Sequence, residues 1–174
     1  MKFKSSSGLT LAELIIGLAV IMILGLISSL YLINLRRSRS LHADTSSIKA
    51  VLRDAQQRAI SQDSIAAGEH WGVHFDNING PTPFYEMFKG SDYPGQRFSK
   101  FLIRSQVTFC KPVLGATFNV FFDNNTGIPG DKNGAPWVNE EYIDLRLRGN
   151  PNEAVSVKVD INGVIDSVSP GVCH

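Results

Sequence analysis

One carboxylate occupies an unusual place in this sequence. Glu13 stands where a long apolar segment begins, with Leu11 before it and Leu14 and Ile15 after it. An ionisable side chain inside a membrane segment costs about 2.5–3.5 kcal/mol and marks a functional position by default. The chemistry open to Glu13 is pairing with a positive amine. Two interpretations stand: a functional contact with such an amine, or a carboxylate that reaches water at the membrane edge.

The two cysteines, Cys110 and Cys173, lie in the second half of the chain and outside any CxxC pair. This spacing argues against a zinc site and against a thioredoxin-type redox centre. Disulfides persist in oxidising compartments, so an extracytoplasmic location predicts a bridge between the C-terminus and a central strand. The alternative is two unpaired buried thiols.

Residues that could support catalysis are scattered. The sequence has no GxSxG, HExxH, GxGxxG or P-loop pattern, so we expect no catalytic residue and no enzyme activity. The four histidines, at positions 42, 70, 74 and 174, lack the spacing of metal ligands on one helix face. We expect His70 and His74 on a strand surface.

Two loops carry oxygen donors that could in principle serve calcium, with Asp123 and Asn125 in one and Asp131 in the other. The bidentate glutamate that an EF-hand requires is missing. Asp, Asn and Gly are also the residues that turns prefer. We therefore expect no resident cofactor or metal, with calcium near these residues as the alternative.

The element that must position Glu13 is the apolar segment itself. Residues 14–33 contain no charged residue and no proline, and a helix needs roughly 20 apolar residues to cross a bilayer. A cleaved secretory signal would have a shorter apolar core of about 7–15 residues. A plain signal anchor fits the length but gives no reason for Glu13. Basic residues flank the segment on both sides: Lys2 and Lys4 before it, and Arg36, Arg37 and Arg39 after it.

Residues 7–14, Ser-Gly-Leu-Thr-Leu-Ala-Glu-Leu, resemble the type III signal sequence of the type IV pilin and type II secretion pseudopilin family. In that family a short basic leader ends in Gly, and an apolar residue, Thr and a Glu at the fifth mature position follow. Gly8, Leu9, Thr10 and Glu13 match in register, with Leu9 where the family usually has Phe.

The resemblance implies a processing and assembly route. A prepilin peptidase of the inner membrane would cut between Gly8 and Leu9 and methylate the new amine of Leu9. Glu13 would pair with the Leu9 amine of a neighbouring subunit. A small residue before the cut lets a membrane-embedded peptidase approach the backbone, which agrees with Gly8.

The helix is expected to continue past the apolar segment. One buried stripe recurs at helical spacing, formed by Ile48, Val51, Leu52, Ala55 and Ala59. From Trp71 the apolar period changes to two, which predicts strands. We expect them within residues 71–75, 84–88, 101–109, 118–122, 142–147, 155–161 and 164–168.

The predicted fold class is α+β: a long N-terminal helix, membrane-spanning in its first half, packed under an antiparallel β-sheet domain of six or seven strands. The expected organisation is a cleaved leader at 1–8, a transmembrane half of the helix at 9–33, an amphipathic half at 34–62 and an extracytoplasmic β-rich domain at 63–174.

The order of a long helix and a strand-rich domain is similar to GspH/FimT-type minor subunits. Two short patterns support this, Trp-Gly-Val-His-Phe at 71–75 and Phe-Phe-Asp-x-x-x-Gly-x-Pro at 121–129. The resemblance implies a minor pilin or pseudopilin of a type IV pilus or type II secretion system. It would be a single-pass inner-membrane protein with a periplasmic domain that moves into the filament, with other subunits and the peptidase as partners.

FimT-type minor pilins are associated with DNA uptake through a basic C-terminal motif, but residues 166–174 contain no arginine. Arg146 and Arg148 share one strand face, yet they alternate with Asp144. From residue 41 onward there are 12 Lys and Arg against 15 Asp and Glu, which does not suit a general polyanion binder. A nucleic-acid partner is therefore not expected. A DNA-binding minor pilin and a plain signal-anchored extracytoplasmic protein remain the alternatives.

Overall fold

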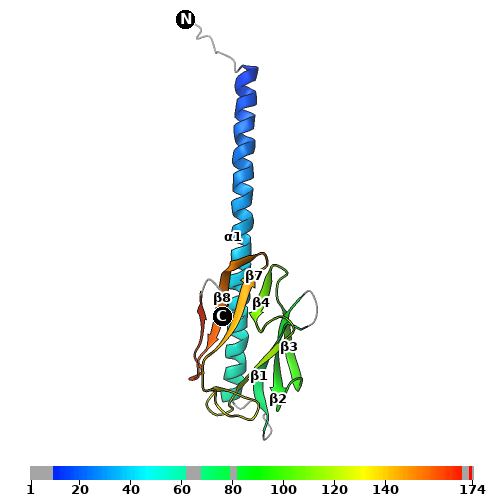
Figure 1. Ribbon diagram of the computed structural model, residues 1–174, viewed down its shortest axis with the longest axis vertical. Helices are drawn as coiled ribbons and strands as arrows, with labels where there is room; N and C mark the ends of the chain where they lie inside the picture. The colour runs from blue at the N-terminus through cyan, green and yellow to red at the C-terminus, as the bar shows by residue number, and fades with distance from the viewer. Residues whose placement is uncertain (1–9, 62–67, 79–81, 170–172, 174) are drawn as a thin grey trace, which may run out of the picture. The chain divides into compact units, whose positions relative to one another are not determined.

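The structure is a computed structural model that describes residues 10–61, 68–78, 82–169 and 173 (Figure 1). Side chains are described at these positions except 27–31, 34 and 151. Gly8 and Leu9 lie outside the described residues. The chain divides into two compact units, residues 1–36 and 37–174, which are treated in turn.

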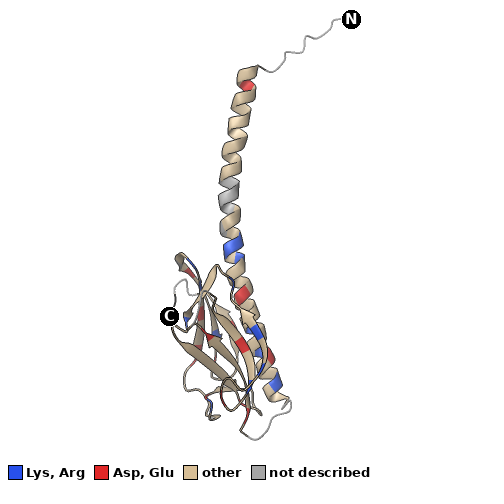
Figure 2. Ribbon diagram, turned by 90° about the vertical axis from the view of Figure 1, so that its right-hand side faces the viewer, with Lys and Arg blue, Asp and Glu red and all other residues tan. Residues whose placement is uncertain are grey.

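The first unit contains the apolar start of helix α1, which runs over Leu11–Ile60. No proline interrupts these residues, so nothing removes a backbone hydrogen bond from the helix interior. In Figure 2 this stretch carries an acidic residue near its start. The apolar side chains of residues 11–26 are exposed, with Ile21 at 70% and Leu26 at 69%.

Membrane crossing was the prediction for residues 9–33. Within the residues that the structure describes, no helical stretch combines the length and the hydropathy that a membrane crossing requires.

The second unit contains two antiparallel sheets. The first has the strand order β3-β2-β1-β5-β6, and the second has the order β4-β7-β8-β9. The strands of the first sheet are β1 (His70–Asp76), β2 (Phe84–Gly90), β3 (Gln96–Leu102), β5 (Thr117–Phe122) and β6 (Pro129–Gly130). Those of the second are β4 (Val107–Lys111), β7 (Glu141–Leu147), β8 (Asn150–Val159) and β9 (Ile165–Val168).

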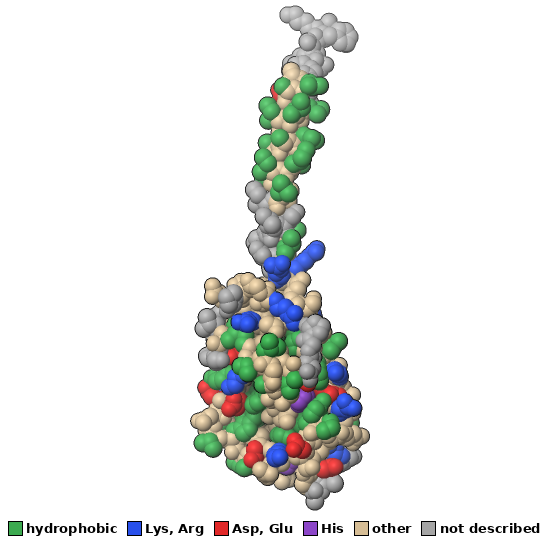
Figure 3. Space-filling view, turned by 45° about the vertical axis from the view of Figure 1, so that its right-hand side comes forward, with side chains coloured by type: hydrophobic (Ala, Val, Ile, Leu, Met, Phe, Trp, Pro, Cys, Tyr) green, Lys and Arg blue, Asp and Glu red, His purple; other side chains and the backbone are tan. Residues whose placement is uncertain are grey.

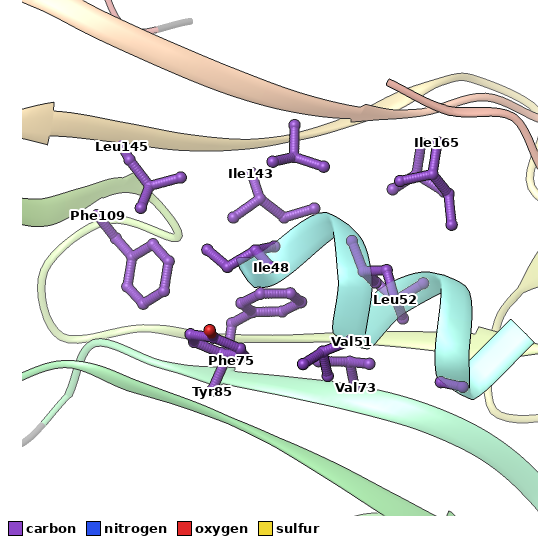
Figure 4. Packing of buried hydrophobic residues seen from close by; sticks show 14 of the residues in the cluster. Ile48, Val51, Leu52, Val73, Phe75, Tyr85, Phe109, Ile143, Leu145 and Ile165 are labelled. Atoms are coloured by element: carbon purple, nitrogen blue, oxygen red, sulfur yellow. The ribbon is translucent and has the colours of Figure 1, made fainter. Parts of the chain in front are cut away.

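The second half of α1 lies between the two sheets (Figure 4). The predicted stripe is buried: Ile48, Leu52, Ala55 and Ala59 are 0% exposed and Val51 is 9% exposed. On one side the stripe faces Val73, Phe75 and Tyr85 of the first sheet, and on the other Ile143 and Ile165 of the second. The α+β class and the buried stripe are thus confirmed.

The strand count was wrong, because the described residues form nine strands in two sheets and not six or seven in one. The predicted strand at 101–109 is two strands that enter different sheets, β3 and β4. Between them the backbone N–H of Arg104 turns toward α1 and donates to Asp44 Oδ2 (3.3 Å). The N–H of Val107 then donates to the Arg104 carbonyl (2.8 Å), which closes a tight turn. Ile103 and Val107 lie on either side of this turn and are both buried. The apolar alternation therefore continues across the turn, and the sequence pattern does not show the break between the strands.

Candidate functional site

Thr10 and Glu13 hydrogen-bond to each other at the start of α1. The Glu13 carboxylate oxygen Oε2 accepts hydrogen bonds from the backbone N–H and from the hydroxyl of Thr10, each at 2.9 Å. In return the Thr10 hydroxyl oxygen accepts a bond from the Glu13 backbone N–H at 3.3 Å. The first N–H groups of a helix have no partner within the helix, and a capping box of this kind satisfies them. Thr10 is therefore the N-cap and Glu13 the third helical residue.

The capping role of Thr10 and Glu13 was not predicted, although its signal is present in the sequence. Thr10-Leu11-Ala12-Glu13 before an apolar run has the Ser/Thr-x-x-Glu spacing of a capping box. A negative side chain in the first turn also interacts favourably with the helix dipole. Glu13 thus has a structural reason to stand where it does, independent of any partner.

The capping role leaves room for a second one. A carboxylate has two oxygens and about four acceptor positions, and the capping bonds use Oε2. A positive amine could therefore be bound by the same carboxylate. The predicted amine is that of Leu9 in a neighbouring subunit. Gly8 and Leu9 lie outside the described residues, so cleavage and methylation there stay predictions.

Cys110 of β4 and Cys173 form a disulfide, with their Cα atoms 6.0 Å apart. The bridge spans 63 residues and ties the last described residue to the second sheet. This is the pairing that the two cysteines predicted.

The loops considered for calcium use their oxygens internally. Asp123 Oδ1 accepts bonds from the backbone N–H groups of Thr126 (2.8 Å) and Asn125 (3.0 Å). Asp131 Oδ1 accepts from the backbone N–H groups of Asn133 and Ala135, both at 2.9 Å. These are turn-closing contacts of the kind that Asp side chains make in loops.

The same backbone N–H donors lower the pKa values of the Asp123 and Asp131 carboxyls. The N–H of Thr126 is the main reason that the pKa of Asp123 lies below its usual range, and the N–H of Ala135 does the same for Asp131. A cavity of about 240 Å³ is lined by both loops, including Asp123 and Gly134. Among the described residues, no group of three or more His, Cys, Asp and Glu side chains gathers where it could hold a metal ion.

The prediction for His74 was wrong. It points to the outer face of the first sheet, as its strand position requires, but it is only 3% exposed. The ring of Tyr93 stacks on it with 3.6 Å between centroids, and its Nδ1 lies 2.6 Å from Asn119 Oδ1. The β2–β3 connection therefore covers this histidine, which a strand pattern alone does not reveal.

Comparison with known proteins identifies the fold. No family model and no curated protein sequence matches the chain. Two crystal structures of the type IV minor pilin FimU of Pseudomonas aeruginosa match in structure, with TM-scores of 0.50 and 0.52 and 14% sequence identity. The first match covers 77% of this chain and 100% of the FimU chain, and the second covers 78% and 96%. The chain therefore shares the fold of these minor pilins.

The disulfide generates a prediction about stability. The Cys110→Ala/Cys173→Ala double variant should lose about 2–4 kcal/mol of unfolding free energy, because the unfolded chain regains the entropy of a long loop. Denaturant titration of the full chain in detergent measures this. A reductant should lower the stability of the wild type equally and leave the double variant unchanged. Two titratable thiols in the denatured, unreduced wild type would contradict the bridge.

The Asp123 loop generates a prediction about pH. A carboxyl whose pKa is lowered on folding stabilises the protein above its unfolded pKa of about 3.9, and the stabilisation disappears as the pH falls through the folded value. Asp123→Ala should therefore lower the melting temperature at pH 7, with a loss of about 1 kcal/mol from its hydrogen bonds. The difference from wild type should shrink between about pH 5 and pH 2. Asn125→Ala, in the same loop, should change stability by an amount independent of pH; the same pattern for both variants would contradict the assignment.

Proposed function

We propose that this chain is a structural subunit of the pilin type, a minor pilin or pseudopilin of a type IV pilus or type II secretion system. The observation that carries the proposal is the Thr10–Glu13 pair that starts α1. This pair is in register with Gly8 and Leu9 in the sequence, and the chain has the fold of the minor pilin FimU. Motif and fold are separate properties of the chain, and both favour the same class. Within it, a GspH/FimT-type subunit is the subclass that the sequence patterns support.

In this proposal the apolar start of α1 first anchors the chain in the inner membrane, with unit 37–174 in the periplasm. Prepilin peptidase removes residues 1–8 and methylates Leu9. The segment 9–33 then leaves the membrane for the filament core, where apolar side chains such as Ile21 and Leu26, exposed in the single chain, pack against those of other subunits. The disulfide agrees with an oxidising compartment.

Glu13 would set the register of assembly. Its carboxylate is held at the helix start by Thr10, so its position along the helix axis is defined before a partner arrives. A new amine on a neighbouring Leu9 would meet a fixed acceptor. In an apolar filament core an uncompensated charge on either partner is costly, which favours subunits that supply both groups.

The two other candidate functions lack comparable support. A plain signal-anchored protein does not require Gly8, Leu9 and Glu13 in register. Nucleic-acid binding rests on clustered Lys and Arg, and residues 166–174 contain neither.

Processing is tested at Gly8. Gly8→Phe should block cleavage, because a bulky side chain keeps the peptidase from the backbone, and the full-length precursor should accumulate in the membrane. Ser7→Phe, one residue further from the cut, is the matched control and should be shortened more fully than Gly8→Phe. Intact mass of the wild type should show loss of residues 1–8 and one added methyl group. Normal shortening of Gly8→Phe would point to another cleavage route.

Assembly is tested at Glu13 with variants that separate charge from capping. Glu13→Gln keeps a side chain that can complete the capping box but removes the charge, whereas Thr10→Ala removes the cap and keeps the charge, at about 1 kcal/mol of helix stability. We expect Glu13→Gln to insert in the membrane yet fail to co-purify with sheared filaments. Thr10→Ala keeps the charge but loses the bonds that hold the carboxylate in place, so it should be incorporated at a reduced level. The opposite pattern would leave Glu13 with a capping role alone.

A further inference from the structure

Strand β3 lies at the edge of the first sheet (Figure 1) and pairs only with β2. None of its seven residues is buried. Within the described part of the chain, no hydrogen bond joins the outer side of this strand to another element. β3 therefore presents a row of unpaired backbone N–H and C=O groups, which is a template for the addition of another strand.

The direction of these backbone groups follows from one hydrogen bond at the end of β3. The backbone N–H of Ile103 donates to the carbonyl of Pro83 (2.9 Å), which continues the pairing of β3 with β2. Successive residues of an antiparallel strand direct their backbone groups alternately toward the partner strand and away from it. Lys100 and Leu102 therefore direct their N–H and C=O groups outward. Nearer the start of the strand, a bulge at Phe98 interrupts this alternation.

The other sheet edges offer less free backbone. β6 has only two residues. At β9 the Arg53 side chain donates to the Ile165 carbonyl (2.7 Å) and Lys49 reaches Asp166 (3.1 Å), so side chains of α1 occupy that edge. β4 has five residues and carries the disulfide to Cys173. β3 is thus the longest of the four edge strands.

The outer face of this edge is basic. Lys100 lies opposite Glu86 in register, and its Nζ is 3.5 Å from the centre of the Phe84 ring. The Arg97 guanidinium approaches the same carboxylate, with Nε 4.0 Å from Glu86 Oε1 and 62% of the side chain exposed. Glu86 also accepts a hydrogen bond from the Tyr93 hydroxyl (3.0 Å). Two exposed cations thus face one buried carboxylate.

The other carboxylates on this side of the sheet have partners of their own. Asp76 of β1 is separated from β3 by strand β2, and its Oδ2 lies 3.9 Å from His74 Nε2. Asp92, in the β2–β3 connection, forms an ion pair with Lys132 (3.4 Å). The positive charge along the edge of β3 is therefore balanced only in part, by Glu86.

The inner face of the edge is apolar. The ring of Phe98 contacts that of Trp71, with 4.6 Å between centroids, and remains 43% exposed. Phe101 stacks on Tyr85 (5.2 Å) and is half-buried. A strand added at this edge would cover both phenylalanine rings with the side chains of its own inner face. Exposed apolar side chains also occur elsewhere on this unit, beside basic and acidic ones (Figure 3), so the free backbone is what distinguishes β3.

We propose that β3 pairs with an extended strand of a neighbouring subunit, a strand with carboxylates on one face and apolar side chains on the other. The carboxylates lie beside Arg97 and Lys100, and the apolar side chains beside Phe98 and Phe101. Opposite charges on neighbouring strands stabilise the pair and like charges destabilise it, so the two cations also disfavour pairing between two copies of β3. The inference rests on the proposed function for the partner's being a filament subunit, whereas the chemistry of the strand follows from the edge itself.

The test uses the full, isotope-labelled chain in detergent and two capped peptides of the length of β3, one alternating valine with glutamate and the other alternating valine with lysine. Amide exchange followed by NMR should slow at Lys100 and Leu102 with the glutamate peptide and stay unchanged with the lysine peptide. The amides of Phe101 and Ile103, which bond to β2, should exchange slowly throughout. Arg97→Glu/Lys100→Glu should bind the glutamate peptide about tenfold more weakly, the effect of two cross-strand charge pairs, and should gain binding to the lysine peptide.

Two further variants serve as controls. Arg39→Glu/Arg146→Glu makes the same charge change at exposed residues of α1 and β7, and it should bind both peptides like the wild type. Leu102→Pro removes one outward N–H, which an edge strand tolerates, and it should abolish the protection of Lys100, whereas Leu102→Val should keep it. Slow exchange at Phe101 in each variant confirms that β3 still pairs with β2.

The outcomes separate this inference from the proposed function. Protection by neither peptide would overturn the strand pairing, and β3 would then be an edge that its charges and its bulge only shield. Equal protection by both peptides would overturn the acidic specificity, and protection that grows with protein concentration alone would show pairing between two copies instead. In cells, Arg97→Glu/Lys100→Glu should be cut after Gly8 like the wild type but be recovered less in sheared filaments; full recovery would overturn a filament subunit as the partner. Absence of cleavage in the wild type would overturn the proposed function, while the peptides would still decide the chemistry of the strand.

Discussion

The burial of one helical stripe between two sheets is the constraint on which the globular unit depends. Each large aliphatic residue that is fully buried contributes about 1.5–3 kcal/mol, and Ile48 and Leu52 are both 0% exposed. Ala55 and Ala59 on the same stripe are also 0% exposed, and such short side chains let a sheet approach the helix closely. Strands placed on both sides of the helix can thus share one core, even though they belong to separate sheets.

Polar residues beside this stripe determine where the connecting loops lie. Arg53 Nη2 donates to the carbonyl of Ile165 (2.7 Å), which attaches β9 to the helix. Gln56 Nε2 donates to the carbonyls of Gly127 and Gly163, each at 2.9 Å, and so holds two loops with one amide. Asp44 is buried, which raises its pKa, and Arg104 opposes this shift with its positive charge. The second half of α1 therefore positions both sheets through its apolar side chains and the connecting loops through its polar side chains.

Local sequence patterns could predict the helix, its stripe and most strands, because these depend on spacing of 3.6 or two residues. They could not predict the break between β3 and β4, since it depends on a contact from Arg104 to Asp44, 60 positions earlier. The burial of His74 under Tyr93 has the same origin, because a covering loop leaves no trace in the strand pattern. At the helix start the reverse holds: Thr10 and Glu13 are three residues apart, and the capping role was readable from the sequence.

The capping role and the proposed assembly role of Glu13 make different demands, and the shared fold does not distinguish between them. A capping box works with Glu or Gln and with any partner or none, so its presence requires no filament. Pairing with an amine needs the charge, and the amine must be made by a cut after Gly8. At 14% identity to FimU the shared fold describes the globular arrangement, and many activities can be built on one fold. The assembly proposal therefore depends on residues 8–13, where a structural need explains Thr10 with Glu13 but does not explain why Gly8 and Leu9 precede them in register.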